Sequence, residues 1–526
     1  MNELTLYDTT LRDGLGMEGI SLSLKDKLSI VKELDALGIH FIEGGFPGSN
    51  PKDAAFFQAV KELKLRNSQI VAFGSTRKAN SDPKKDSFLK ALIDADTTYV
   101  TIVGKSSLSQ VKDVLQTTDE ENIAMIKESI EYLTSKKKKV VFDAEHFFDG
   151  YHENKDYAIK SIKAASMAGA STLVLCDTNG GTLPSDIQKI TNEVVKLNIG
   201  EIGIHVHNDT DMAVANTIIA VQQGASHIQA CLNGWGERTG NANIISVIAN
   251  LKLKLGIDVI SDQQLSELTR VAHFADELAN IIPNNRQPYV GKSAFAHKAG
   301  LHVAAITKSS GTYTHIDPTL VGNRERILVS EFSGRRNIEE KVKELDITID
   351  LTNEETTKIL ENIKDLEAKG LQYEAASASF ELIVRKIKED YRSPFIVEDF
   401  LVVERKQIIE NKDSNKIISD AMVKVRVGEE VHQSAANGSG PVDALDSALK
   451  SALINFYPHL STIHLIDYKV RIFNPAQGTA AGVRVFIESS DSIQSWSTVG
   501  ASTDVIEASF VALQDAYEYW LIHNKK

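Results

Sequence analysis

The sequence predicts an α/β protein built from an N-terminal (β/α)8 TIM barrel, helical linker subdomains and a C-terminal α+β domain of two βββα repeats. Two observations predict the barrel. Short β-rich runs alternate with longer helical patterns through about residue 265, and polar side chains gather where those runs end. The third observation is an internal repeat near the C-terminus. We therefore divide the chain into residues 1–265, 266–390 and 391–526.

The barrel is predicted from eight strand-like runs, separated by helical stretches such as SLKDKLSIVKELDALG. Eight strand–helix units in about 250 residues are typical of a closed (β/α)8 barrel. An open doubly wound sheet alternates in the same way. No glycine-rich dinucleotide fingerprint follows the first run, however, and this favours the barrel. The runs cover residues 4–8, 40–45, 69–74, 98–104, 140–145, 171–178, 202–209 and 227–234.

The C-terminal part carries an internal repeat, in which residues 423–453 match residues 483–513 in pattern. Each half reads as a β-meander, a small-residue turn and a helix capped near Asp443 or Asp504. The repeat contains no evident catalytic constellation, so a binding or dimerisation module fits it better. Residues 266–390, between the barrel and the repeat, read as helical patterns around a loop-rich middle.

Composition narrows the class of protein. The net charge of −13 argues against general binding of nucleic acid or anionic membranes, and no apolar run is long enough to span a bilayer. The N-terminus passes almost directly into a strand pattern, which predicts no signal or transit peptide. The two cysteines, Cys176 and Cys231, follow apolar runs and are expected to be small core residues in a reducing compartment. We therefore expect a cytoplasmic protein.

Candidate site residues stand at or just after the ends of the predicted strands, where barrel enzymes build their active sites. This shared position is stronger evidence than any single motif. The residues are Asp8, Arg12 and Asp13 at or after the first run, Glu43 in the second, Asp143 and Glu145 in the fifth, Asp177 and Thr178 in the sixth, and His205 and His207 in the seventh.

A metal site is predicted from Asp13, His205 and His207. The two histidines are one residue apart in a strand pattern, so their side chains point to the same face. One carboxylate and two imidazoles suit Mg²⁺, Mn²⁺ or Zn²⁺, with positions left for water or substrate. Asn241, which follows the eighth run, is either a further ligand or a turn residue between glycine and alanine.

Arg12 would stand beside a metal-bound Asp13, where a fixed guanidinium can stabilise charge that develops on a polarised carbonyl oxygen. Glu43 is the natural partner to hold that guanidinium in place. Without a metal, Arg12 and Glu43 would form only a structural ion pair.

Six motifs together resemble the DRE-TIM metallolyase superfamily: DTTLRDG, FIEGG, FDAEHFFDG, CDTNGGTLP, HVHND and NGWGERTGNA. Within that superfamily they resemble the Claisen-condensing branch, which includes the isopropylmalate, homocitrate and citramalate synthases. The resemblance extends through the HKAGLH segment and the C-terminal repeat. EGGFPGSNPKD and FDAEHFFDGY are most similar to the citramalate synthases, which condense pyruvate with acetyl-CoA.

The resemblance implies roles for the site residues. Asp13, His205 and His207 would bind the divalent metal, Arg12 would stabilise the enolate or alkoxide oxygen, and Glu43 would orient Arg12. Thr178 matches a residue that contacts the carboxylate of the 2-oxo acid, and Glu145 matches a glutamate at the acyl acceptor site. His302 matches a histidine that reaches the neighbouring subunit's barrel and helps to deprotonate acetyl-CoA; from the residues alone it reads as a linker packing residue.

The sequence departs from the family pattern at Gly16, where a glutamine is usual after the Arg-Asp pair. Glu325 stands where isopropylmalate synthases can have a tyrosine, which favours pyruvate over the branched 2-oxo acid. Three alternatives stay open: a 2-isopropylmalate synthase, a lyase that cleaves a C–C bond at the same site, and a non-catalytic amino-acid sensor.

The repeated domain resembles the regulatory domain of the family, which implies a homodimer inhibited by an end product. Isoleucine is the end product that a citramalate route would serve. The glycines of residues 435–441 and 497–503 would let backbone N–H groups approach a carboxylate at the start of each helix, or would serve only as tight turns.

Overall fold

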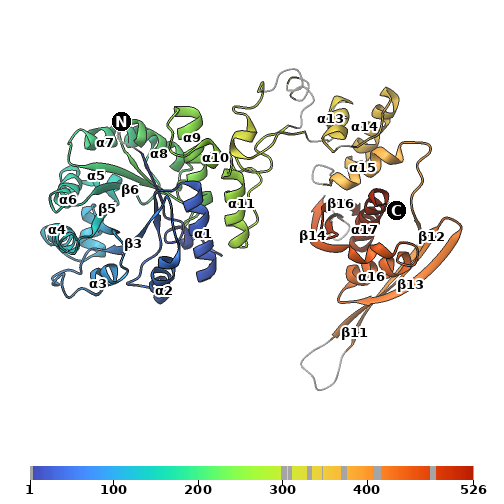
Figure 1. Ribbon diagram of the computed structural model, residues 1–526, viewed down its shortest axis with the longest axis horizontal. Helices are drawn as coiled ribbons and strands as arrows, with labels where there is room; N and C mark the ends of the chain where they lie inside the picture. The colour runs from blue at the N-terminus through green and yellow to red at the C-terminus, as the bar shows by residue number, and fades with distance from the viewer. Residues whose placement is uncertain are drawn as a thin grey trace. The chain divides into compact units, whose positions relative to one another are not determined.

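Eight parallel strands close into a barrel in the computed structural model of the chain, which confirms the predicted fold and excludes the open sheet (Figure 1). The structure describes residues 4–297, 302, 305, 311–327, 335–345, 347–368, 376–407, 416–473 and 481–524. Two compact units form: one holds residues up to 295 together with 315–324, and the other holds the remainder. The predicted boundaries between three parts stay predictions.

The barrel unit follows the predicted order of strand and helix. Its strands are β1 Thr5–Asp8, β2 Phe41–Glu43, β3 Gln69–Ser75, β4 Tyr99–Lys105, β5 Lys139–Glu145, β6 Thr172–Asp177, β7 Glu201–Val206 and β8 His227–Ala230. Its helices are α1 Leu24–Leu37, α2 Pro51–Ala59, α3 Ser87–Asp94, α4 Asp119–Ser135, α5 Phe147–Glu153, α6 Lys155–Met167, α7 Pro184–Val195, α8 Ala213–Gln222, α9 Ile244–Leu255, α10 Asp262–Leu265 and α11 Leu268–Leu278.

Local sequence explains where these elements begin and end. Helix α1 starts at a capping box, in which Ser23 and Asp26 satisfy each other's backbone N–H groups, and ends at Gly38 with a φ of 88°. Its Ile30 and Leu34 are fully buried against the barrel. The apolar core therefore lies mainly between strands and helices, which leaves the barrel interior free to carry polar side chains.

Two strands end earlier than their apolar runs suggest. Strand β7 ends at Val206, and His207 instead forms an isolated antiparallel bridge with Asn241. Strand β8 ends at Ala230, because residues Leu232–Gly234 turn in a short helix in which Asn233 has a φ of 52°. These early endings bring the loop after β8 back over the end of β7.

The second unit contains the helices and antiparallel sheets of the linker and repeat. Strands β11, β12 and β13 form one sheet, and β14, β15 and β16 form another, so the predicted pair of βββα units is present. Its elements are β9 Ala296–His297, β10 Arg326–Ile327, α13 Arg335–Glu344, α14 Asn353–Ala368, α15 Ser377–Lys386, β11 Ile396–Gln407, β12 Lys416–Val427, β13 Glu430–Gly438, α16 Pro441–Leu453, β14 His464–Phe473, β15 Gly482–Ser490, β16 Ser495–Ser502 and α17 Val505–His523.

The predicted small-residue turns of the repeat are wrong: residues 435–441 and 497–503 lie mostly within β13 and β16. Gly438 and Gly500 serve packing instead. A Cβ atom at Gly438 would stand 2.4 Å from the backbone nitrogen of Ala444, and one at Gly500 would stand 2.0 Å from the carbonyl oxygen of Ala508. Both glycines therefore let a strand lie directly on the helix that follows it.

The helix caps of the repeat differ between the halves. Asp504 caps α17 by accepting hydrogen bonds from the backbone nitrogens of Ile506 and Glu507, as predicted. Asp443 instead lies in the first turn of α16, after the cap residue Gly440, and accepts from the backbone nitrogen of Ser439. Among the described residues, no helix has both the length and the apolar character needed to cross a membrane.

A buried histidine at the N-terminal end of the barrel makes stability depend on pH. His227 is 1% exposed and its Nδ1 lies 3.1 Å from Thr5 Oγ1. Burial, with repulsion from His40, lowers the pKa of His227 to about 3. Between pH 6.5 and about 3 the unfolded chain therefore binds a proton here that the folded chain does not, so acid favours unfolding.

We expect His227→Gln to flatten the acid side of the stability profile. Below pH 6.5, the free energy of unfolding of the wild type should fall by up to about 1.4 kcal/mol per pH unit more steeply than that of the variant. Urea denaturation at several pH values measures both slopes. The exposed His459 provides a control, since His459→Gln should leave the wild-type slope intact. Equal slopes for His227→Gln and the wild type would contradict the assignment.

Candidate active site

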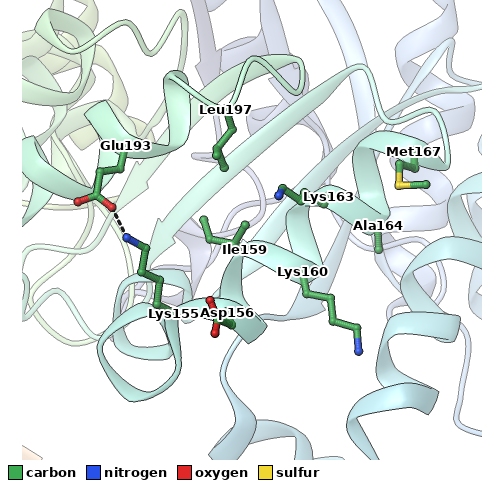
Figure 2. A pocket seen from close by; sticks show the side chains of 9 residues that line it. All are labelled: Lys155, Asp156, Ile159, Lys160, Lys163, Ala164, Met167, Glu193 and Leu197. Carbon is green, nitrogen blue, oxygen red and sulfur yellow. Dashed lines mark hydrogen bonds and ion pairs between the residues drawn. The ribbon is translucent and has the colours of Figure 1, made fainter.

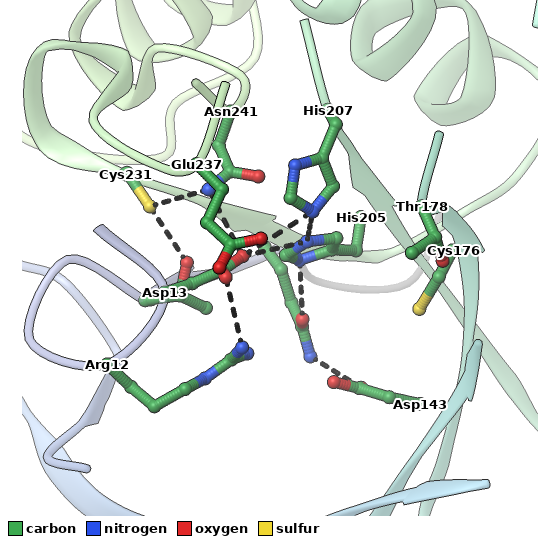
Figure 3. Close-up of polar contacts among 12 residues, drawn as sticks. Arg12, Asp13, Asp143, Cys176, Thr178, His205, His207, Cys231, Glu237 and Asn241 are labelled. Atoms are coloured by element: carbon green, nitrogen blue, oxygen red, sulfur yellow. Dashed lines mark hydrogen bonds and ion pairs between the residues drawn. The ribbon is translucent and has the colours of Figure 1, made fainter. Parts of the chain in front are cut away.

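Three predicted ligand residues meet at the C-terminal end of the barrel (Figure 3). His205 Nε2 lies 3.3 Å from His207 Nε2 and 3.2 Å from Asp13 Oδ2, and His207 Nε2 lies 3.7 Å from the same carboxylate oxygen. One potential ligand atom from each of these residues lies within 4.8 Å of the other two. The spacing of the two histidines therefore does place their side chains on one face.

Asn241 joins this group because the bridge between residues 207 and 241 holds its backbone beside His207. Its Nδ2 donates to Asp13 Oδ2 at 3.1 Å and to the carbonyl oxygen of Trp235 at 3.2 Å. Its Oδ1 is buried and has no hydrogen-bond partner among the described residues. Because the carbonyl oxygen of Trp235 accepts from Nδ2, the amide is held in one orientation, and its Oδ1 stays available to a cation.

The set fits a divalent cation. Two imidazole nitrogens and a carboxylate oxygen lie within 4.8 Å of one another, and no described residue donates a hydrogen bond to the buried Asn241 Oδ1. A buried acceptor without a partner costs free energy unless something supplies a positive charge or a donor. Oxygen and nitrogen donors of this kind suit Mg²⁺, Mn²⁺ or Zn²⁺.

Electrostatics keep the carboxylate charged. Burial opposes ionisation of Asp13, but the positive charge of Arg12 and the hydrogen bond from His205 outweigh it and hold the pKa well below its usual range. Burial and the neighbouring His205 lower the pKa of His207 to about 4. An ionised carboxylate and a neutral imidazole are the forms that bind metal ions.

Arg12 is held from two sides. Its Nε donates to Glu43 Oε2 at 2.5 Å, and its Nη1 lies 3.2 Å from Asp13 Oδ1. The guanidinium also lies 3.9 Å from the centre of the Phe73 ring. Glu43 is fully buried and accepts a second hydrogen bond from Tyr7, at 2.8 Å. The guanidinium therefore has one fixed orientation beside the carboxylate of Asp13.

A second buried chain of contacts reaches His205 from across the barrel. Sequence reasoning placed Asp143 at the site but missed Gln229, which links it to His205. His205 Nδ1 lies 3.0 Å from Gln229 Oε1, and Gln229 Nε2 donates to Asp143 Oδ1 at 2.9 Å. Burial, with repulsion from Glu43, raises the pKa of Asp143 to about 7. The available signal was a glutamine within the apolar run at 227–234.

Thr178 and Glu145, which were predicted to contact substrates, lie at the C-terminal ends of β6 and β5. Thr178 follows β6, and its Oγ1 accepts a hydrogen bond from the backbone nitrogen of His146 at 2.8 Å. This contact leaves the hydroxyl proton of Thr178 as a donor. Glu145 ends β5, is partly exposed, and forms an ion pair with Lys105 at 2.5 Å.

Gly16, the departure from the family pattern, has a local explanation. A Cβ atom at residue 16 would lie 2.7 Å from Glu237 Cγ, so Glu237 occupies the space that a larger residue would take. Both cysteines are buried and unpaired, and Cys231 Sγ lies 3.4 Å from Asn241 Nδ2, at the edge of the site. Cys231 thus has a polar neighbourhood that its apolar run did not predict.

His302 and Glu325 belong to the second unit. The exposed ring of His302 stacks on Tyr313 with centroids 4.1 Å apart, and Glu325 lies 3.5 Å from His297. The role predicted for His302 stays a prediction.

Two hollows on the barrel unit contain few of the predicted site residues. A groove of about 440 Å³ between α6 and α7 is lined by lysines, Met167 and Leu197, and contains none of them (Figure 2). A cavity of about 510 Å³ beside the loop after β8 includes Asn241 and is lined mainly by polar side chains. The predicted site residues therefore gather at the strand ends rather than in the groove.

Comparison with known proteins identifies three matching families along the chain. The HMGL-like family matches residues 3–275, the homocitrate synthase post-HMGL domain-like family matches residues 289–371, and the LeuA allosteric (dimerisation) domain family matches residues 374–521.

Relatives match over nearly the whole chain. An (R)-citramalate synthase of Geobacter sulfurreducens is 49% identical, covering 99% of this chain and 98% of its own length. An (R)-citramalate synthase of Aquifex aeolicus is 48% identical with the same coverage. A 2-isopropylmalate synthase of Methanocaldococcus jannaschii is 32% identical, covering 99% of this chain and 95% of its own length.

We expect Asn241→Ala to weaken Mn²⁺ binding by about tenfold, because it removes an amide that contacts Asp13 and carries a buried, unpartnered oxygen. Isothermal titration of the full chain with Mn²⁺ measures this. Asn250→Ala is the control, since Asn250 bonds to Tyr289 and Ser246 and lies outside the ligand set. If Asn241→Ala binds Mn²⁺ as the control does, Asn241 is only a turn residue.

Proposed function

The chain belongs to the citramalate synthases of the DRE-TIM metallolyase superfamily, and from this premise we propose that it condenses acetyl-CoA with pyruvate to form citramalate and free CoA. The predicted resemblance is thereby confirmed, and the chain is an acyl-transferring enzyme. The substrate assignment rests on sequence identity. This chain is 44–49% identical to five (R)-citramalate synthases but 29–32% identical to three isopropylmalate synthases.

We propose that Asp13, His205, His207 and Asn241 hold Mg²⁺ or Mn²⁺. A bound divalent cation would polarise the ketone of pyruvate. The contacts between the three ligand residues and the unpartnered oxygen of Asn241 support this assignment. The two oxygen donors suit Mg²⁺ and Mn²⁺, while the two imidazoles keep Zn²⁺ compatible with the site.

Arg12 would stabilise the oxygen that gains charge as the new C–C bond forms. Because Glu43 and Asp13 fix the guanidinium from two sides, it needs no rearrangement at the moment of reaction. Thr178 would donate its hydroxyl proton to the carboxylate of pyruvate, and Glu145 would lie at the acetyl-CoA side.

The reaction balances with water as the third reactant. A base removes a proton from the methyl group of acetyl-CoA, the resulting enolate carbon attacks the ketone carbon of pyruvate, and the alkoxide oxygen then takes up a proton. Water then hydrolyses the thioester of the product, which releases CoA and citramalate. We propose His302 of a second copy of the chain as a participant in the deprotonation, on the basis of the motif in which it lies.

We expect kcat/KM to be much larger for pyruvate than for 2-oxoisovalerate. A pocket shaped for a methyl group excludes an isopropyl group by steric clash, which discriminates more strongly than the 1–3 kcal/mol of one missing methylene. Thiol release from acetyl-CoA, measured with a panel of 2-oxo acids, tests this. A preference for 2-oxoisovalerate would make the enzyme an isopropylmalate synthase, and no release with any acid would favour a sensor.

We propose that the enzyme is a cytoplasmic homodimer that serves isoleucine synthesis and is inhibited by isoleucine. The match of residues 374–521 to the LeuA allosteric (dimerisation) domain supports regulation and dimerisation. The two buried, unpaired cysteines support a reducing compartment. Inhibition requires isoleucine to bind the less active state more tightly than the active state.

Isoleucine should lower turnover and bind the intact protein, with leucine as the matched control ligand. Titration calorimetry on the full chain reads binding, and light scattering should give twice the chain mass of 57.8 kDa. The full chain is preferable to a truncation near residue 390, because α15 would lose the ion pair of Lys386 with the buried Glu518 of α17. Binding of leucine in place of isoleucine would overturn both the effector and the pathway.

A further inference from the structure

We propose that Gln229 and Asp143 are positioning residues that hold His205 in the tautomer with its proton on Nδ1, so that Nε2 faces the cation site. This inference rests on the proposed function, because it assumes that the site binds a divalent cation. It joins Asp143, a candidate site residue for which the sequence predicted no specific role, to Gln229, which the sequence did not single out.

The contacts determine which way the amide of Gln229 points. Its Nε2 donates to Asp143 Oδ1 at 2.9 Å, so its Oε1 is the atom that faces His205 Nδ1 at 3.0 Å. An amide oxygen can only accept a hydrogen bond. Nδ1 of His205 must therefore carry the proton for this contact to be a hydrogen bond.

The opposite orientation of the amide is disfavoured. Rotating it by half a turn would place Oε1 against Asp143 Oδ1, two acceptors at hydrogen-bond distance. This orientation follows from the ionised carboxylate of Asp143, the form present above its pKa of about 7, because a protonated carboxyl group could donate to the rotated amide. Gln229 is 1% exposed and Asp143 4%, so water cannot readily replace either contact.

The strand register explains how the hydrogen-bonded series from His205 through Gln229 to Asp143, here called the relay, is positioned. His205 on β7 pairs directly with Gln229 on β8, and the glutamine side chain then spans the barrel interior to β5. A neutral imidazole with its proton on Nδ1 has its lone pair on Nε2. That nitrogen is the atom that lies beside Asp13 Oδ2 and His207 Nε2.

The two histidines of the site therefore differ. His207 Nδ1 is buried without a hydrogen-bond partner in the described structure, whereas His205 Nδ1 has a dedicated one. Partners of this kind fix the tautomer and ring orientation of a metal-binding histidine, and their loss typically weakens metal affinity about 10–100-fold. The relay is thus specific to His205.

Two variants test the relay by Mn²⁺ titration of the full chain. Gln229→Met keeps the volume but removes both hydrogen bonds, and we expect Mn²⁺ affinity to fall at least about tenfold. The double variant Gln229→Glu with Asp143→Asn exchanges donor and acceptor. Its amide at position 143 donates to a carboxylate at position 229, which still accepts from His205. We expect it to bind Mn²⁺ much more tightly than Gln229→Met.

The control is Gln287→Met, which removes another buried glutamine hydrogen bond, to Asn233, without touching the ligand set. It should bind Mn²⁺ as the wild type does. Equal affinity of Gln229→Met and Gln287→Met would overturn the proposal, and so would a double variant no tighter than Gln229→Met.

A second measurement uses only the wild-type protein, so it does not depend on whether a variant folds. Nitrogen-15 spectra of histidine-labelled wild type with Mg²⁺ bound, at about pH 9, report which ring nitrogen of His205 carries the proton. We expect Nδ1, and a proton on Nε2 would overturn the proposal. Neither measurement uses a 2-oxo acid, so an error in the substrate assignment would leave both unchanged and would appear only in the thiol-release assay.

Discussion

The carboxylate of Asp13 is the point on which the site depends, because a buried charge is stable only when its surroundings compensate it. Arg12 supplies positive charge on one side, and His205 and His207 present nitrogens on the other. Two of these neighbours are themselves held by a buried acid, Arg12 by Glu43 and His205 by Asp143 through Gln229. Two series of buried polar contacts, one through Arg12 and one through His205, therefore meet at the carboxylate of Asp13.

The barrel accommodates these chains because its apolar core lies elsewhere. In most such barrels branched apolar side chains fill the interior, whereas here Tyr7, Glu43, Thr101, Asp143 and Gln229 are buried inside the ring of strands. Tyr7 bonds to both Glu43 and Thr101, so the interior polar groups are largely satisfied by one another. The stability of the barrel then rests on the apolar layer between strands and helices.

Much of this arrangement could be predicted from the sequence. Parallel strands bring their ends to one rim, so Asp13, His205 and His207 could be placed together from strand order alone. Gln229 could not, because a single glutamine in an apolar run does not say which strand it faces across the barrel. The small-residue stretches of the repeat were misread, because glycines that permit strand-to-helix packing look the same as glycines in turns.

The most direct measurement of the central claim is an anomalous diffraction map from crystals of the full chain grown with Mn²⁺. We expect one manganese peak bonded to Asp13, His205 Nε2 and His207 Nε2, with Asn241 Oδ1 directed toward it. We also expect Gln229 to stay hydrogen-bonded to His205 Nδ1. A peak at another position, or a histidine that binds manganese through Nδ1, would show that these residues do not form the metal site in this way.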